Sequence, residues 1–460
     1  MGDVLLLNPP PQGCYQFRDI LFGDTPPVDV VEFPVNLASV ASSLLASGCS
    51  ISVLDANALQ TPFDDVLTQV EQQDPDVIVI PASSTSIEPV LTDARAIREV
   101  APDTRQVLMG LIGPSLHRRA LDVVDAISID DHEEMISDLL SRPWDPARVD
   151  GLIWSDRGRT VINPDRPHTD LDALPFPARH LFPLDLYIHY LVKQDVHYTN
   201  MVTSRGCVHR CTFCSRSFSK RREWRGRSPA NVADEFQEVS ERLGIREFRV
   251  IDEDFLHDRD RVLGIAREMR ERDLDVNWVI TARADGIDKE IAEALASAGC
   301  FRIDIGVESA NPDILRSTGK GVDLDTVSSA FSTVHEAGIA AGALLIVGLP
   351  GETWESVAQS VSFAREVGSD FTIFRSILPY PDTPLHTQAV RKGWLDENGH
   401  LSRPEFTADD VKQATTWAYR TFYLDPAFMA RRAARVRGGR DARHLLRSFG
   451  KFLKFYKGLG

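Results

Sequence analysis

Short apolar runs alternate with segments of helical periodicity in two separate series, and this alternation limits the possible folds more than any other feature of the sequence. In the first series, residues 1–141, four apolar runs each stop at a polar or turn residue: Val4–Leu7, Ile51–Leu54, Val77–Ile80 and Val107–Met109. Between them, apolar residues recur at helical spacing, as in Leu37–Ala46 and Val90–Val100. Strands that alternate with helices predict an α/β, doubly wound Rossmann-like domain, which binds ligands beyond the carboxyl ends of its parallel strands.

The second series occupies residues 199–392, after a Pro-, Asp- and His-rich stretch at 142–198 that we interpret as a linker. Its six predicted strands are Tyr198–Thr203, Glu247–Asp252, Asn277–Thr281, Phe301–Gly306, Ala343–Val347 and Phe371–Leu378. Ser228 and Pro229 are the expected N-cap and first residue of the helix after the first strand. Six strand–helix units predict a partial (β/α)6 barrel with its chemistry at the carboxyl ends of the strands. Residues 393–460 are expected to form a helical C-terminal region.

Composition excludes several classes of protein. Among 460 residues, 51 basic and 67 acidic side chains give a formal net charge of −16, which disfavours nucleic-acid binding. The N-terminal apolar run is too short for a signal peptide, and no stretch approaches the ~20 apolar residues that span a bilayer. We therefore expect a cytoplasmic protein. Six cysteines are too few for a disulfide framework in a chain of this length.

Three of the cysteines, Cys207, Cys211 and Cys214, fall within eight positions directly after a predicted strand. Cysteines spaced in this way can supply three thiolates to one [4Fe-4S] cluster, which leaves one iron open for chemistry. A zinc site completed by His209 or a distant cysteine is the alternative, although the second half of a paired zinc motif is missing. A non-catalytic iron–sulfur protein is the alternative from another class, but a fourth cysteine ligand would then be expected.

CxxxCxxC at the first strand of a six-fold partial barrel resembles the radical S-adenosylmethionine (SAM) superfamily. The resemblance implies that the open iron binds SAM and that one electron splits SAM into methionine and a 5′-deoxyadenosyl radical. It also implies SAM-binding roles for residues at the ends of later strands, namely Asp252, Glu253, Arg283, Glu308, Gly348, Gly351 and Glu352. No residue is assigned to a catalytic step. One turn departs from the family pattern, with Asp382 where glycine is usual, and Asp tolerates positive φ better than most residues.

A doubly wound domain ahead of such a barrel is similar to the cobalamin-binding branch of this superfamily. The resemblance implies cobalamin contacts from the loops that follow the first four strands, at Asn8, Asp55, Ser83, Ser84, Thr85, Gly110 and Gly113. The DxHxxG segment is absent, so no histidine is marked as a lower axial ligand, as is normal in this branch. Residues 129–133 replace the usual acidic-glycine loop, and a scaffold domain that has lost cobalamin stays an alternative.

The last segment of the chain predicts an amphipathic helix, with one apolar stripe opposite Arg443, Arg447, Lys451 and Lys454: Leu445, Phe449, Phe452, Leu453 and Tyr456. Such a helix either lies on an anionic membrane surface or packs on the barrel with a solvated basic face.

These features predict a radical SAM enzyme that uses cobalamin to methylate an unactivated carbon of a hydrophobic small molecule. An external one-electron reductant, such as flavodoxin or ferredoxin, is expected. Ring closure or rearrangement of a lipid or tetrapyrrole is the enzymatic alternative.

Overall fold

The computed structural model describes residues 3–10, 31–141, 143–187, 197–219 and 221–434. The chain divides into two compact units. Unit 1 contains the described parts of residues 1–16, 31–188 and 218–221, and unit 2 contains the described remainder. The predicted amphipathic helix at 443–456 lies outside the described residues. None of the described helices is both long enough and apolar enough to cross a bilayer.

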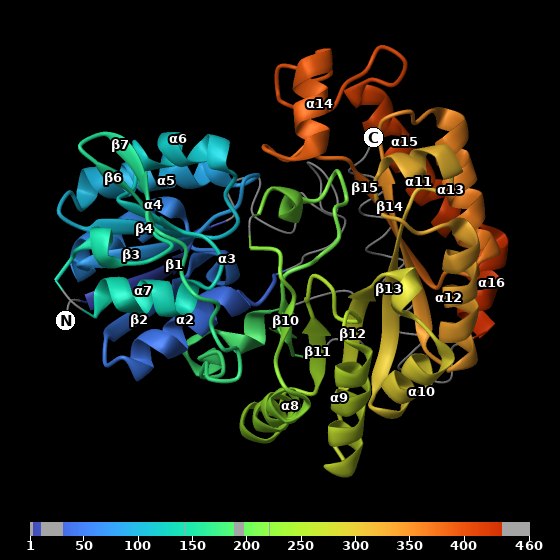
Figure 1. The fold of residues 1–460 in the computed structure, drawn as a ribbon, viewed down its shortest axis with the longest axis horizontal. Helices are drawn as coiled ribbons and strands as arrows, with labels where there is room; N and C mark the ends of the chain where they lie inside the picture. Colours follow the sequence, from blue (N-terminus) through green and yellow to red (C-terminus); the bar gives the residue numbers. More distant parts are fainter. Residues whose placement is uncertain (1–2, 11–30, 142, 188–196, 220, 435–460) are drawn as a thin grey trace. The chain divides into compact units, whose positions relative to one another are not determined.

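Unit 1 is built on a sheet with strand order β2-β1-β3-β4-β5-β6-β7 (Figure 1). Its strands are β1 (Asp3–Asn8), β2 (Ser50–Asp55), β3 (Val77–Pro81), β4 (Arg105–Met109), β5 (Ala126–Ser128), β6 (Ile153–Asp156) and β7 (Arg159–Ile162). The first five strands pair in parallel, as predicted for a doubly wound domain. The strand order reverses at β1, between β2 and β3, which is where such sheets bind ligands.

Helices cover both faces of this sheet, as its largely buried strands β1, β3, β4 and β5 require. α2 packs beside α7 on one face, and α4 packs beside α5 on the other (Figure 1). The α-helices are α2 (Val35–Ala46), α3 (Ala56–Leu59), α4 (Phe63–Gln73), α5 (Ile87–Val100), α6 (His117–Leu121) and α7 (His132–Leu140). Short 3-10 turns are η1 (Pro114–Leu116), η2 (Pro146–Arg148), η3 (Arg179–Leu181) and η4 (Leu184–Leu186).

The stretch interpreted as a linker contains secondary structure that the sequence analysis did not foresee. β6 and β7 pair antiparallel with each other, and β6 extends the sheet beyond β5. The seven residues from Ile153 to Arg159 hold only two large apolar side chains, so the pattern of a buried strand is missing there. Antiparallel strands at the edge of a sheet can stay half exposed, which explains the weak signal.

Unit 2 contains a six-stranded parallel sheet with the sequential order β8-β11-β12-β13-β14-β15, as expected for a partial barrel. Its strands are β8 (Tyr198–Met201), β11 (Glu247–Val250), β12 (Asn277–Ala282), β13 (Cys300–Glu308), β14 (Ala340–Val347) and β15 (Phe371–Ser376). The short strands β9 (Ser204–Arg205) and β10 (Arg225–Gly226) form an antiparallel ribbon beside the sheet.

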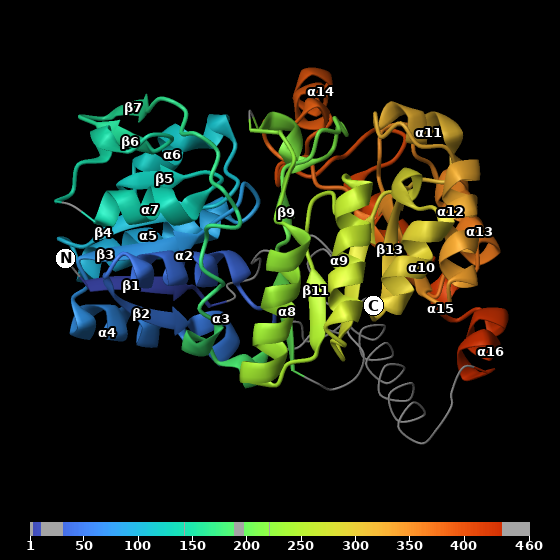
Figure 2. The same ribbon diagram turned by 60° about the horizontal axis from the view of Figure 1, so that its bottom comes forward.

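Helices follow the strands of this sheet along the chain (Figure 2). They are α8 (Pro229–Leu243), α9 (Arg259–Glu271), α10 (Lys289–Ser297), α11 (Pro312–Ser317), α12 (Leu324–Glu336), α13 (Trp354–Glu366), α14 (Pro384–Lys392), α15 (Ala408–Tyr423) and α16 (Pro426–Ala434), with 3-10 turns η5 (Ser215–Phe218) and η6 (Ala284–Gly286). Ser228 caps α8 as predicted, because its side chain accepts a hydrogen bond from Asn231 N. Asp382 has φ +68°, so the turn expected to tolerate aspartate does so.

Candidate active site

The three clustered cysteines lie on the loop that joins β9 to β10. Gly206 opens this loop with φ +89°, and a Cβ at this position would lie 2.1 Å from Glu223 O. Only glycine therefore fits the entry of the loop. The Cys207, Cys211 and Cys214 side chains are all half-buried.

Two carboxylates at the end of β11 hold this loop in place. Asp252 accepts hydrogen bonds from Thr203 N at 2.6 Å, Thr203 Oγ1 at 2.5 Å and Ser204 Oγ at 2.6 Å. Glu253 accepts one from Gly206 N at 2.6 Å, ahead of the first cysteine, and one from Arg216 Nε, beyond the last. Both carboxylates thus position the cysteine loop, and a direct contact of either with SAM stays a prediction.

The thiols fit a [4Fe-4S] cluster with three protein ligands. All five cysteines in the described ranges are free thiols. No three His, Cys, Asp or Glu side chains of the described chain are arranged to share one metal ion. A [4Fe-4S] cubane does not need three side chains around one metal ion, because each thiolate binds a different iron. Burial raises the pKa of all three thiols, and that of Cys214 to about 11, so ligation must displace their protons.

The structure brings two predicted SAM-binding residues together through a lysine that the sequence analysis missed. Glu308 ends β13 with φ +66°, and its Oε1 accepts a hydrogen bond from Lys320 Nζ at 2.6 Å. Arg283, just after β12, donates to Lys320 O at 2.9 Å and to both carboxylate oxygens of Asp285, at 3.0 and 2.7 Å. A left-handed backbone at a non-glycine residue costs free energy and is typical of functional sites.

Lys320 also belongs to a segment that contacts the cysteine loop. Thr212 N donates to Thr318 O at 2.8 Å, and a Cβ on Gly319 would lie 3.3 Å from Arg210 O. The only sequence signal for Lys320 is a basic residue between two glycines after a helix, a pattern common in solvated loops. Its role depends on neighbours that are distant in sequence.

The turn after β14 has the backbone conformation that its glycines predict. Gly348 has φ +102°, and a Cβ there would lie 2.7 Å from Ile377 Cγ2 and 2.8 Å from Val411 Cγ2. Gly351 has φ +89°. Glu352 closes the turn by accepting hydrogen bonds from the backbone N–H groups of Gly348 and Leu349, and burial raises its pKa to about 7. The Glu352 carboxylate therefore shapes the turn that is predicted to receive SAM.

A His–Asp–His group beside the cysteine loop escaped the sequence analysis. Asp254 Oδ2 lies 3.4 Å from His209 Nε2 and 3.3 Å from His257 Nδ1. Trp224 Nε1 donates to Asp254 O at 2.9 Å, and the Trp224 and His257 rings are 4.9 Å apart. His209, the fourth ligand of the zinc alternative, is thus turned toward Asp254.

The predicted cobalamin contacts of unit 1 fall on neighbouring loops at the carboxyl ends of β1 to β4. Asn8 Nδ2 donates to Asp55 Oδ1 at 2.8 Å, and Tyr187 Oη donates to Asp55 Oδ2 at 2.7 Å. Asp55 also accepts a hydrogen bond from Ala58 N at 2.9 Å, and burial raises the pKa of this carboxyl. The β1 and β2 loops are therefore joined by a buried hydrogen-bond network.

Serine hydroxyls join the next two loops. Ser84 Oγ accepts from Gly113 N at 2.9 Å and donates to Leu111 O at 3.3 Å, while Ser83 Oγ lies 3.0 Å from Thr85 Oγ1. Gly110 has φ +143°, and a Cβ there would lie 1.8 Å from Ala82 O. Small residues are thus required for these loops to approach one another.

The segment that replaces the usual acidic-glycine loop follows β5. Asp130 and Asp131 both have positive φ, 55° and 41°. Two consecutive left-handed residues give the backbone a conformation that glycine would otherwise supply. The substitution therefore preserves a glycine-like turn at this edge of the sheet.

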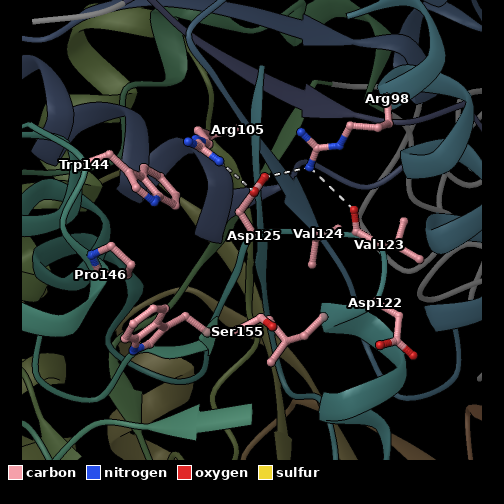
Figure 3. Close-up of a pocket in the computed structure, with 11 residues that line it drawn as sticks. Arg98, Arg105, Asp122, Val123, Val124, Asp125, Trp144, Pro146 and Ser155 are labelled. Atoms are coloured by element: carbon pink, nitrogen blue, oxygen red, sulfur yellow. Dashed lines mark hydrogen bonds and ion pairs between the residues drawn. The ribbon is translucent and has the colours of Figure 1, made fainter. Parts of the chain in front are cut away.

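A pocket of about 440 Å³ lies at the opposite edge of the unit 1 sheet, by the amino ends of β4 and β5. Arg98 and Arg105 form ion pairs with Asp125, with N–O distances of 2.6 and 3.3 Å. Figure 3 shows both side chains pointing toward this carboxylate. Arg105 also lies over the Trp144 ring, 5.6 Å from its centroid. None of the predicted site residues lines this pocket.

Comparison with known proteins identifies the family of one part of the chain. Residues 201–364 match the Radical SAM superfamily model. These residues therefore form a radical SAM domain, as the three cysteines predicted, and this superfamily implies SAM and a [4Fe-4S] cluster as cofactors.

Similarity to other proteins extends over both units of the chain. An uncharacterized methyltransferase of Pyrococcus horikoshii is 28% identical over 440 residues, covering 92% of this chain and 93% of that protein. Cytidylyl-2-hydroxyethylphosphonate methyltransferase of Streptomyces wedmorensis is 23% identical, covering 90% and 86%. The structure of TsrM from Kitasatospora setae, a radical SAM methyltransferase with cobalamin and a [4Fe-4S] cluster bound, has a TM-score of 0.68 at 17% identity, covering 92% and 89%. The described chain thus has the fold of that enzyme.

Proposed function

We propose that this protein is a cobalamin-dependent radical SAM methyltransferase that transfers a methyl group to an unactivated carbon of a small molecule. The observation that carries the proposal is that similarity to methyltransferases spans both units rather than the barrel alone, covering 92% and 90% of the chain. An anaerobic magnesium-protoporphyrin IX monomethyl ester cyclase of Rubrivivax gelatinosus also covers both units, with 86% of the chain against 92% for the methyltransferase of Pyrococcus horikoshii, so ring closure is the second candidate function.

In unit 2, Cys207, Cys211 and Cys214 hold the cluster, and Asp252 and Glu253 keep their loop in place through the hydrogen bonds described above. A [4Fe-4S] cluster bound there supplies the electron for reductive cleavage of SAM. Glu308, Arg283 and the Gly348–Glu352 turn lie at the carboxyl ends of β13, β12 and β14, where SAM would bind. These residues orient SAM and exclude water from the radical that forms.

In unit 1, the loops that carry Asn8, Ser83–Thr85, Gly110 and Gly113 hold cobalamin, which carries the methyl group. Two observations support this role. The loops lie at the edge of the sheet where the strand order reverses, and the backbone at Gly110 closely approaches Ala82. The glycine-like turn at Asp130 and Asp131 argues against a domain that has lost the cofactor.

The substrate and the electron donor are narrower proposals. A hydrophobic substrate is supported by the basic amphipathic segment at the C-terminus, which would bring the enzyme to a membrane surface. Flavodoxin or ferredoxin is the proposed one-electron donor.

Anaerobic reconstitution tests the proposal. The wild-type protein should bind iron, sulfide and cobalt, form 5′-deoxyadenosine on reduction, and transfer label from methyl-labelled SAM to its product. A variant with Cys207, Cys211 and Cys214 all replaced by Ala should lose iron and SAM cleavage, whereas Cys49→Ala should keep both. Cleavage of SAM by a protein that binds iron but never cobalt would remove the methylcobalamin mechanism and leave ring closure.

A further inference from the structure

We propose that Lys320 is a positioning residue, whose ammonium group holds Glu308 at the SAM site and whose charge favours the reduced form of the neighbouring cluster. The proposal rests on the proposed function, because it requires a [4Fe-4S] cluster on Cys207, Cys211 and Cys214. It adds a role for a residue outside the motifs that identify the family.

The Lys320 ammonium group is buried, with 5% of its side chain exposed. It donates to Gly306 O and to Glu308 Oε1, both at 2.6 Å. Burial of a charge is costly unless the charge is paired and hydrogen-bonded, and these two acceptors meet that condition. An ammonium group has three N–H donors, so one remains beyond these two acceptors.

The same contacts hold the strained end of β13. Glu308 has φ +66°, and the pairing of β13 with β14 shifts between Gly306 and Glu308. A Cβ on Gly306 would lie 2.3 Å from Lys320 Nζ, so glycine leaves the space that the ammonium group fills. The hydrogen bonds from Lys320 to both residues bridge this irregularity and fix the direction of the Glu308 side chain.

Lys320 is also close enough to the cysteine loop for its charge to act there. The Thr318–Gly319 backbone contacts Arg210 and Thr212 on either side of Cys211. The ammonium group of Lys320 and the carboxylate of Glu308 both interact electrostatically with the Cys211 side chain. Both charges therefore act on a cluster ligand, and with opposite signs.

This opposition predicts opposite redox effects. Reduction adds a negative charge to the cluster, and net charge near a cluster is one determinant of its reduction potential. Removal of the Lys320 charge leaves Glu308 unbalanced and disfavours reduction. Removal of the Glu308 charge leaves Lys320 unbalanced and favours reduction.

The experiment compares the cluster-loaded wild-type protein with Lys320→Met, Glu308→Gln and the double variant. At a fixed solution potential, we expect the ratio of reduced to oxidised cluster to fall about tenfold in Lys320→Met and to rise about tenfold in Glu308→Gln, a shift of ~59 mV each way. The double variant should lie close to wild type. Both single variants should bind SAM more weakly, because Lys320→Met no longer holds Glu308 in place and Glu308→Gln lacks its carboxylate.

Lys289→Met is the matched control, since Lys289 is 80% exposed on α10 and lies 3.8 Å from Glu293. It should change neither the redox ratio nor SAM binding. Shifts of the same sign in both single variants, or a Lys320→Met protein that matches the control, would overturn the proposal. If Lys320→Met does not fold, Glu308→Gln decides, because an unchanged potential contradicts the charge effect. A wild-type protein without iron and sulfide instead refutes the proposed function.

Discussion

Glu253 accepts a hydrogen bond from the backbone N–H of Gly206 at 2.6 Å, across 47 residues of sequence. Because Glu253 also accepts from Arg216, one carboxylate holds both ends of the cysteine loop. Gly206 is fixed by a second constraint, the Glu223 carbonyl oxygen that leaves no room for a Cβ. Gly206 is therefore constrained from two sides at the start of the cysteine loop.

Gly206→Ala should lose most of its bound iron after reconstitution and should lower the free energy of unfolding by about 1–3 kcal/mol, because the methyl group clashes with Glu223 O. Gly244→Ala is the control, since Gly244 has φ +68° and nothing lies within 4 Å of its Cβ position. It should cost about 1–2 kcal/mol and keep its iron. Equal iron content in the two variants would contradict the role of the clash.

Glu352 should make stability depend on pH in a defined direction. Its pKa is raised by burial to about 7, above the ordinary value of 4.5, so the folded protein binds a proton that the unfolded chain releases in this range. The contribution of Glu352 to the free energy of unfolding is therefore present below pH 4.5 and is lost as the pH rises toward 7.

Chemical denaturation at pH 5 and pH 8 measures the free energy of unfolding of wild type and Glu352→Gln. We expect the difference between wild type and variant to shift in favour of the variant at pH 8, by on the order of 2 kcal/mol. Glu355→Gln, at an exposed position on α13, is the control and should show no pH-dependent difference. A wild-type advantage that grows with pH would refute the assignment.

Tyrosine hydroxyls of α15 should stabilise the edge strand β15. Tyr423 Oη accepts from Thr372 N at 3.0 Å and donates to Thr372 O at 2.8 Å, and Tyr419 Oη accepts from Phe374 N at 3.2 Å. Tyr423→Phe should cost about 2 kcal/mol of unfolding free energy and Tyr419→Phe about 1 kcal/mol, because backbone groups lose their partners. Urea denaturation measures both, and Thr416→Val, on the exposed side of α15, should cost less than about 0.5 kcal/mol.

Ser84→Ala should weaken unit 1 and its affinity for cobalamin. The change leaves Gly113 N without the acceptor it has at 2.9 Å, which should cost about 1–2 kcal/mol. Ser137→Ala should be neutral within about 0.5 kcal/mol, because the buried Ser137 hydroxyl has no hydrogen-bond partner among the described residues. Denaturation and cobalamin titration of both variants test this, and a destabilised Ser137→Ala would contradict it.

Local patterns were enough to predict the core of both units. Four parallel strands of unit 1, β1 to β4, begin or end within a few residues of the apolar runs, because strands buried on both faces need continuous apolar sequence. The fifth parallel strand, β5, is only three residues long and was not predicted. Ser228 and Pro229 predicted the start of α8 because capping depends on residues within one helical turn. Edge strands such as β6 carry no such requirement, and they were missed.

Spacing along the chain also predicted the three cluster ligands, since Cys207, Cys211 and Cys214 share one loop. The hydrogen bonds that hold that loop could not be predicted from neighbouring residues in the sequence. Asp252 and Glu253 were predicted at the correct strand end, but their hydrogen bonds to Thr203, Ser204 and Gly206 depend on β11 pairing with β8. The pairing of neighbouring strands sets which side chains meet.

The sequence by itself therefore determined the order of strands and helices, the cysteine loop and the class of chemistry, because each depends on residues close together in the chain. Only the tertiary structure decided that Lys320 joins Glu308 to the cysteine loop and that α15 covers the edge of β15. Those contacts join segments that strand pairing and helix packing bring together, and no short-range pattern of residue types encodes such distances.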